Sequence, residues 1–237
     1  MVLVWKGNLN NLSDFEKNLD EKSKEFYSKY KDSIIDFFNR LDKDGVLNTK
    51  FKQQDVDRFV KISEMSDAAF LLNKNVKHFF IKLDAGEKDD LLKKMIKYGI
   101  EADKNSVTYQ AISILCNAYQ TYTEDIKKYL ILSVNFDKLG LTDADKKPMG
   151  WLISCLEGKG YLTDFLQYIK DNNFIRNAIA HYSFYLSDNG KLIFCDGLLG
   201  DEEEKSISDF IHMTVDLNTL SNSFVLIFLT KFIRIEK

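Results

Sequence analysis

The sequence predicts an all-α protein, a helical bundle with one small β-hairpin. Two observations support this fold class. The 237 residues include a single proline and 11 glycines, so little interrupts the helices. Apolar residues also recur at helical spacing along most of the chain. With 45% hydrophobic and 29% charged residues, the composition excludes collagen-like, low-complexity and disordered classes.

The first predicted helix covers residues 13–41. Ser13 and Glu16 have the spacing of a capping box, in which two side-chain oxygens satisfy free backbone N–H groups at a helix start. Asp42–Gly45 then ends the helix. This segment is only superficially like a calcium loop, because Arg40 and Phe51 would stand where carboxylates are needed. The helix carries an apolar stripe made of Phe15, Leu19, Phe26, Tyr30, Ile34, Phe37, Phe38 and Leu41.

Further helices are predicted at residues 54–83, 87–103 and 106–135, again from helical spacing of apolar residues. Pro148 suits the first turn of a short helix that ends near Gly158 and Gly160. Another helix is expected at 162–182. The stripe of the 106–135 helix has ordinary core spacing and consists of Val107, Ala111, Ile114, Leu115, Ala118, Tyr122, Ile126, Tyr129 and Leu130.

A β-hairpin is predicted after residue 182, with strands at 183–186 and 191–195. Between them stands Asp188-Asn189-Gly190, in which Asn-Gly can supply two positive φ values. We expect the hairpin to pack against helices, since an isolated one is marginal in water. Its expected apolar face consists of Phe184, Leu186, Leu192 and Phe194.

A last helix is expected at residues 206–235. The preceding acidic run, 201–204, is interpreted as its solvated start. From Phe224 to Leu229 the helix is apolar on nearly all sides, which places it at the centre of the bundle or in a subunit interface.

The net charge and the cysteine content of the chain bear on whether it binds polyanions or zinc. The net charge is −3, so any site for a polyanion must come from local positive charge. The three cysteines, at 116, 155 and 195, are an odd number and lack the paired spacing of a zinc site, and they have apolar neighbours typical of buried thiols. Neither a signal peptide nor a bilayer-spanning run is evident. We therefore expect a cytoplasmic protein without membrane contact, metal or cofactor.

One group of residues could carry chemistry: Arg176, followed by Asn177 and, five positions after the arginine, by His181. On one helix, Arg176 and His181 are about 140° apart. Asn173, Asn177 and His181 form a row with a spacing of four, opposite the apolar side. His78 and His212, by contrast, stand alone, and the sequence contains neither a Walker loop nor a serine elbow.

An arginine and a histidine placed in this way can cleave RNA without a metal ion. The guanidinium matches phosphate oxygens and keeps its charge at neutral pH. The imidazole can remove the proton of the 2′-OH, and that oxygen then attacks the adjacent phosphorus while the cation stabilises the developing charge. DNA lacks this nucleophile and should not be cleaved.

The segment Arg176-Asn177-Ala178-Ile179-Ala180-His181 matches the R-N-x-x-x-H form of the HEPN signature, and residues 105–237 resemble a HEPN domain. Residues 1–104 are then an additional N-terminal helical region. The resemblance implies a helical bundle that forms a homodimer with both signatures in a shared cleft. It also implies a metal-independent endoribonuclease of a toxin–antitoxin or phage-defence (antiviral, abortive-infection) system, restrained by an antitoxin or regulatory protein.

By this resemblance Arg176 binds phosphate and organises the site, His181 is the catalytic imidazole, and Asn177 positions the site. Lys170 and Asn173 are candidate RNA contacts on the same segment. Some HEPN toxins carry a modified tyrosine two residues after the histidine, but here that position is Ser183. Two alternatives remain open: a non-catalytic HEPN module that binds nucleotide, RNA or protein, and a structural bundle whose Arg and His only form a solvated face.

Overall fold

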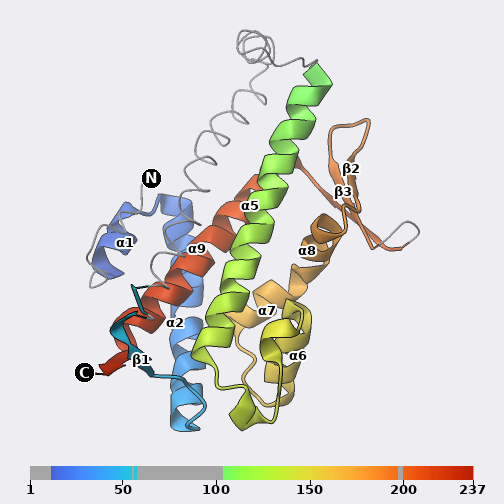
Figure 1. The fold of residues 1–237 in the computed structure, drawn as a ribbon. Helices are drawn as coiled ribbons and strands as arrows, with labels where there is room; N and C mark the ends of the chain where they lie inside the picture. Colours follow the sequence, from blue (N-terminus) through green and yellow to red (C-terminus); the bar gives the residue numbers. More distant parts are fainter. Residues whose placement is uncertain (1–11, 55, 58–103, 197–199, 237) are drawn as a thin grey trace.

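The protein is a mostly helical bundle with a small three-stranded sheet, as Figure 1 shows for the computed structural model. The structure describes residues 12–54, 56–57, 104–196 and 200–236. Of the predicted helices, 87–103 and nearly all of 54–83 lie outside these ranges. The mainly α class is confirmed for the described residues.

Three long helices form the centre of the fold: α2 (Glu21–Lys43), α5 (Lys104–Ser133) and α9 (Ile207–Lys231). Phe38 of α2 packs on Phe224 and Phe228 of α9, with ring centroids 4.8 and 5.2 Å apart. Tyr129 of α5 stacks on the same Phe224. Every residue of α9 from 217 to 228 is buried, so of the two predicted positions, the centre of the bundle or a subunit interface, the structure shows the first.

The predicted helix at 13–41 is two helices, α1 (Leu12–Asn18) and α2. The chain breaks because Asp20 caps α2 by accepting a hydrogen bond of 2.8 Å from the Ser23 N–H. The capping-box prediction at Ser13 is wrong as well, since α1 begins at Leu12. Glu16 instead joins α1 to α2 by accepting hydrogen bonds from Tyr27 (2.7 Å) and Lys31 (2.6 Å).

Helix α6 (Met149–Gly158) agrees with the prediction, and Pro148 directly precedes it. The helix predicted at 162–182, however, is broken into α7 (Asp164–Asp171) and α8 (Asn173–Ala180). At the break, the Asn172 side chain donates to the Tyr168 carbonyl at 2.7 Å and competes with the backbone ladder. The Tyr119 hydroxyl of α5 donates to the Asn172 carbonyl, which places the break against the core.

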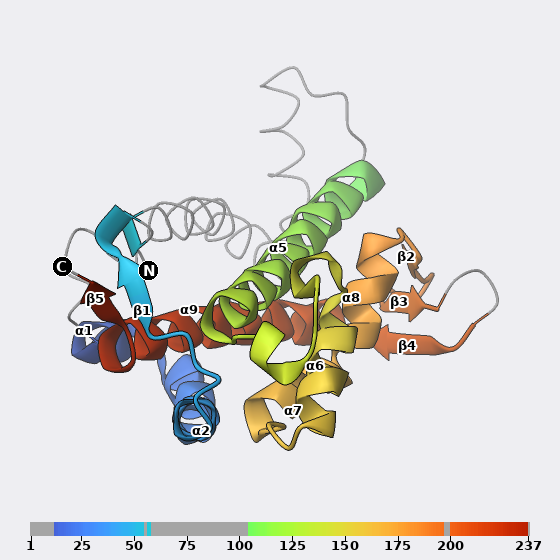
Figure 2. The same ribbon diagram turned by 60° about the horizontal axis from the view of Figure 1, so that its bottom comes forward.

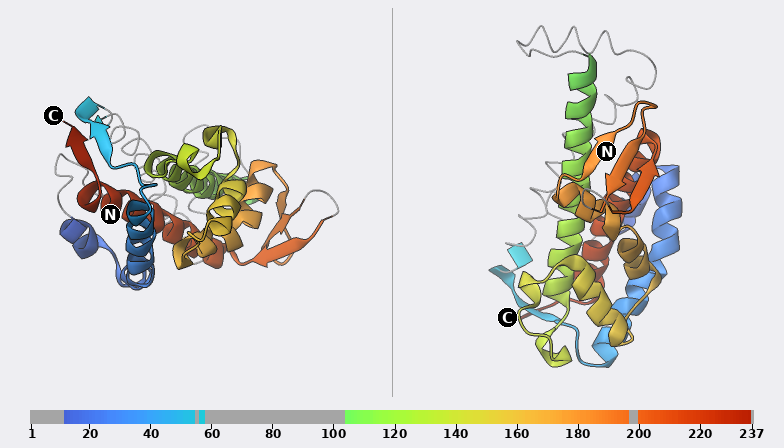
Figure 3. Two further views of the ribbon diagram at one scale, coloured as in Figure 1. Left: turned by 90° about the horizontal axis from the view of Figure 1, so that it is seen from below. Right: turned by 90° about the vertical axis from the view of Figure 1, so that its right-hand side faces the viewer.

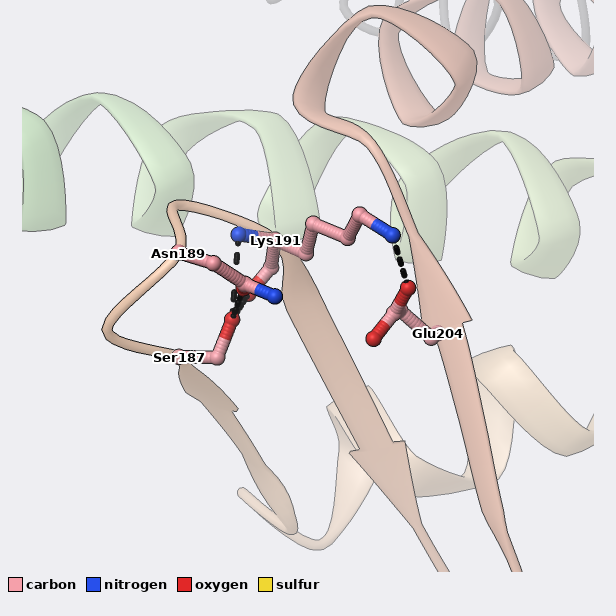
Figure 4. A network of polar contacts seen from close by, with 4 residues as sticks. All are labelled: Ser187, Asn189, Lys191 and Glu204. Carbon is pink, nitrogen blue, oxygen red and sulfur yellow. Dashed lines mark hydrogen bonds and ion pairs between the residues drawn. The ribbon is translucent and has the colours of Figure 1, made fainter.

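The predicted hairpin consists of β2 (Phe184–Leu186) and β3 (Leu192–Cys195), which pair antiparallel. Its turn differs from the prediction, because only Gly190 has a positive φ, of 78°. The Gly190 N–H donates to the Ser187 carbonyl, and the Ser187 N–H donates to the Lys191 carbonyl. Asp188-Asn189-Gly190 is therefore a three-residue loop, which needs one left-handed residue rather than two (Figure 4).

The acidic run at 201–204 is not a helix start, because Glu202–Lys205 form strand β4 beside β3. Lys191, which directly precedes β3, pairs with Glu204 of β4 (Figure 4), and Lys205 pairs with Glu203 at 2.7 Å. Two of the three glutamates of β4 thus have a lysine partner. Helix α9 begins after Ser206, which accepts a hydrogen bond from the Asp209 N–H. As predicted, the hairpin packs on helices: Phe194 is fully buried and contacts Phe210 of α9.

A second small sheet was not predicted. Strand β1 (Lys50–Lys52) pairs in parallel with β5 (Arg234–Glu236), so α9 ends at Lys231 and not at 235. Figure 3 shows the two sheets at opposite ends of the molecule. Residues of α2 share one core cluster with those of α5 to α9, so the two halves of the chain are packed together. Within the described ranges, no helix has an apolar stretch of the length that crossing a bilayer requires.

Candidate functional site

The candidate site lies on α8 and at its C-terminal end, where the chain enters the three-stranded sheet (Figure 2). Ile175, Ala178 and Ile179 are buried and fix α8 on α5 and β3. Arg176 and Asn177 are half-buried on the other side of the helix. His181 is the residue that caps α8, and its side chain is exposed.

Arg176 is held by two neighbours. One terminal nitrogen, Nη2, forms an ion pair with Oε1 of Glu124 on α5, and the other, Nη1, donates to Asn177 Oδ1 at 3.3 Å. The third nitrogen, Nε, is buried without a hydrogen-bond partner. The side chain is only 16% exposed, and its guanidinium links α8 to α5. The structure thus places the side chains of Arg176 and Asn177 in contact.

Glu124 is the member of the site that sequence reasoning missed. It lies 52 positions before Arg176 on α5, a helix whose apolar stripe predicts only core packing. Its side chain is 30% exposed. Beside Arg176, this carboxylate lowers the net positive charge that a phosphate would meet. No spacing rule joins two residues on separate helices, so the pair becomes visible only in three dimensions.

The C-terminal end of α8 has a regular cap. The His181 N–H donates to the Asn177 carbonyl at 3.0 Å, the Tyr182 N–H to Ile179 and the Ser183 N–H to Ala178. The last two bonds form a Schellman motif, which ends the helix and turns the chain into β2. Consequently, His181 stands at a hydrogen-bonded helix end and is exposed to solvent.

The two candidate RNA contacts lie toward α6. Lys170 forms a salt bridge of 2.7 Å with Glu157 at the end of α6, and both side chains are more than a third exposed. Asn173 lies against Gly150, where an added Cβ would come within 3.0 Å of the asparagine Nδ2. The break at Asn172 therefore separates the two residues, because Lys170 belongs to α7 and Asn173 is the first residue of α8.

The remaining candidate groups do not join this site. Cys116 is buried, and this burial raises the pKa of its thiol to about 12. Cys155 and Cys195 are free and half-buried, so they are less enclosed than expected. Among the described residues, histidines, cysteines and carboxylates are nowhere grouped in threes suited to a metal ion. His78 lies outside the described residues.

A second polar region, remote in sequence from the signature, lies between α2 and α9. His212, Asp216 and Lys29 line an open pocket there with a volume of about 930 Å³. Burial, and secondarily the nearby Asp20, raises the pKa of Asp216 to about 6, while Lys22 and Lys29 act in the opposite direction. His212, interpreted from the sequence as standing alone, thus has a carboxyl group one helical turn away.

The comparisons with known proteins leave the family open. No family model matches the chain, and no curated protein or solved structure was found to be similar to it.

Proposed function

We propose that this protein is a metal-independent endoribonuclease of the HEPN type. The observation that carries the proposal is the arrangement on α8: Arg176 and Asn177 are in contact, and His181 is exposed at the end of the same helix. An imidazole that acts as a general base must reach its substrate, and an exposed histidine at a capped helix end meets that requirement.

In the proposed reaction, His181 removes the proton of a ribose 2′-OH. The 2′ oxygen attacks the adjacent phosphorus, and the bond from phosphorus to the 5′ oxygen breaks. The leaving 5′ oxygen takes up a proton from water or from a second imidazole. The products are a 2′,3′-cyclic phosphate and a 5′-hydroxyl end. Arg176 stabilises the phosphorane-like charge, or organises the site through Asn177 and Glu124.

The HEPN resemblance extends the proposal to the assembly and its biological role. We expect a cytoplasmic homodimer in which two copies of α8 face a shared cleft, because one subunit supplies only one arginine and one imidazole at the site. We further expect a toxin–antitoxin or phage-defence role with a regulatory partner protein, since an unrestrained ribonuclease would destroy the RNA of its own cell.

One observation favours a second candidate, a non-catalytic HEPN module that binds nucleotide, RNA or protein. Glu124 already occupies Nη2 of Arg176, so a phosphate must displace or bypass this carboxylate. If Arg176 remains in the ion pair throughout, it holds α8 on α5 and does not take part in cleavage.

The experiment is incubation of the purified full chain with RNA in EDTA. Wild-type protein should cleave the RNA and leave 2′,3′-cyclic phosphate ends, and should leave DNA of the same sequence intact. His181→Ala should abolish cleavage. His212→Ala is the matched control, because it removes another exposed histidine from a different part of the bundle and should cleave normally.

Other results of this experiment would support the non-catalytic module or the structural bundle instead. RNA binding without cleavage supports the non-catalytic module. A folded dimer that neither binds nor cleaves RNA supports a purely structural bundle. Analytical ultracentrifugation tests the assembly separately, and a strict monomer at micromolar concentration would contradict the shared cleft.

A further inference from the structure

Tyr182, the residue after His181, has a backbone conformation that tyrosine rarely adopts. Its φ is 55°, in the left-handed region, and Asp143 is the other described residue with a side chain in that region. Side chains with a Cβ carry a conformational cost there, whereas glycine does not.

The Schellman motif at the end of α8 causes this conformation. Tyr182 stands at the position after the cap, where its N–H donates to the Ile179 carbonyl at 3.1 Å and Ser183 donates to Ala178 at 2.8 Å. Glycine is the usual residue at this position. The helix end therefore requires the left-handed turn but not a tyrosine.

Packing does not compensate for the strain. Tyr182 is 87% exposed, more than any other large hydrophobic residue at the surface of the described part of the chain. The next most exposed are Tyr109 at 55% and Tyr185 at 49%. A strained residue that is almost fully exposed on the described part of the chain is a candidate for binding a molecule outside it.

We propose that Tyr182 is a base-stacking residue, whose ring takes the nucleobase next to the phosphate cleaved at His181. The inference rests on the proposed function. The two residues are consecutive, with Cα atoms about 3.8 Å apart, and both are exposed, so an RNA strand whose phosphate lies at His181 is within reach of the phenol ring. Every nucleobase has a face that can stack on an aromatic ring, so this contact would tolerate many sequences.

The neighbouring exposed tyrosine is less suited to this role. The Tyr185 hydroxyl of β2 lies 3.4 Å from a Glu202 carboxylate oxygen on β4. A carboxylate beside the ring repels the phosphates that flank a stacked base. We therefore assign stacking to Tyr182 alone.

Two variants in a His181→Ala background, which removes cleavage, test the assignment by binding. The probe is a fluorescently labelled single-stranded RNA, and its affinity is measured by anisotropy. Tyr182→Gly should weaken binding by about fivefold to a hundredfold. Tyr182→Phe keeps the ring and should retain the affinity. Tyr109→Ala, which removes an exposed ring from α5, is the control and should also bind normally.

Thermal unfolding distinguishes stacking on RNA from a structural role of the ring. If the ring stabilised the fold, its removal would lower the unfolding midpoint. Because glycine adopts the left-handed turn without strain, Tyr182→Gly should raise the unfolding midpoint by about 2–4 °C. A more stable variant that binds RNA more weakly supports the proposal. A Tyr182→Gly variant that binds as tightly as its parent, or that unfolds at a lower temperature, overturns it.

The outcomes separate this inference from the proposed function. Cleavage by the wild-type protein with unchanged binding by Tyr182→Gly refutes stacking only. Binding that depends on Tyr182, without cleavage by the wild-type protein, refutes the ribonuclease only. Absence of any RNA binding refutes both. Loss of dimerisation in Tyr182→Gly would assign the ring to a protein interface and also overturn stacking.

Discussion

The ion pair between Arg176 and Glu124 should contribute measurably to stability, and its strength can be estimated from its burial. The side chains are 16% and 30% exposed, between a surface pair and a buried one. Surface pairs couple by about 0.2–1 kcal/mol, and loss of one partner of a fully buried pair costs about 3–5 kcal/mol. We expect a coupling of about 1–2 kcal/mol between the two side chains.

A double-mutant cycle measures this coupling. Arg176→Met, Glu124→Gln and the double variant are compared with the wild-type protein in urea denaturation, and the coupling is the non-additive part of their unfolding free energies. Arg40 and Asp36 of α2 are the matched control, because they pair at 2.6 Å with 47% and 48% of their side chains exposed. Their coupling should stay below about 0.5 kcal/mol. A coupling at 176–124 no larger than this control would refute the structural role of Arg176.

Three further predictions concern the bundle itself. Burial raises the pKa of Asp216 from its ordinary 3.8 to about 6, so folding favours its protonated form and stability should fall as the pH rises from about 4 to 7. The free energy of unfolding is measured by urea denaturation at about pH 4 and about pH 7. After allowance for partial exposure, Asp216→Asn should make the difference between the two values smaller by about 1–2 kcal/mol. A variant with the same pH dependence as the wild-type protein would contradict the raised pKa. Phe224→Ala, which empties a fully buried site among aromatic rings, should cost about 3–5 kcal/mol, and a loss below about 1 kcal/mol would show that the core closes around the gap. Ser206→Ala removes the N-cap of α9 and should cost about 1 kcal/mol, whereas Ser206→Gly should cost only a few tenths.

Long elements with a strong apolar period could be predicted from the sequence, and local breaks could not. The helices α5, α6 and α9 lie close to their predicted ranges. The two breaks, at Asp20 and Asn172, arise where a polar side chain bonds the backbone, and apolar residues continue in period on both sides. A periodicity argument therefore joins each pair of helices into one.

Strand pairing was the least predictable part of the fold. Glu202–Lys205 carry mostly acidic side chains, which favoured a helix start in the sequence. They form a strand because β3 offers an edge and because Lys191 and Lys205 pair with Glu204 and Glu203. The parallel pairing of β1 with β5 joins segments far apart in the chain, and only three residues of each strand take part. The sequence near either strand therefore does not predict the pairing.

For the candidate site, the sequence predicted the members on α8 and missed their partner on α5. That partner decides how Arg176 can act. A coupling of 1–2 kcal/mol corresponds to a factor of about 5–30 in an equilibrium constant, so an RNA phosphate could displace Glu124 at that cost in affinity. If Arg176 binds the scissile phosphate, Glu124→Gln should increase cleavage while it lowers stability, because the competing charge is gone. If Arg176 only organises the site, Glu124→Gln should lower both. The sign of the change in cleavage thus separates the two roles of the arginine, and the stability measurement shows that the ion pair was in fact removed.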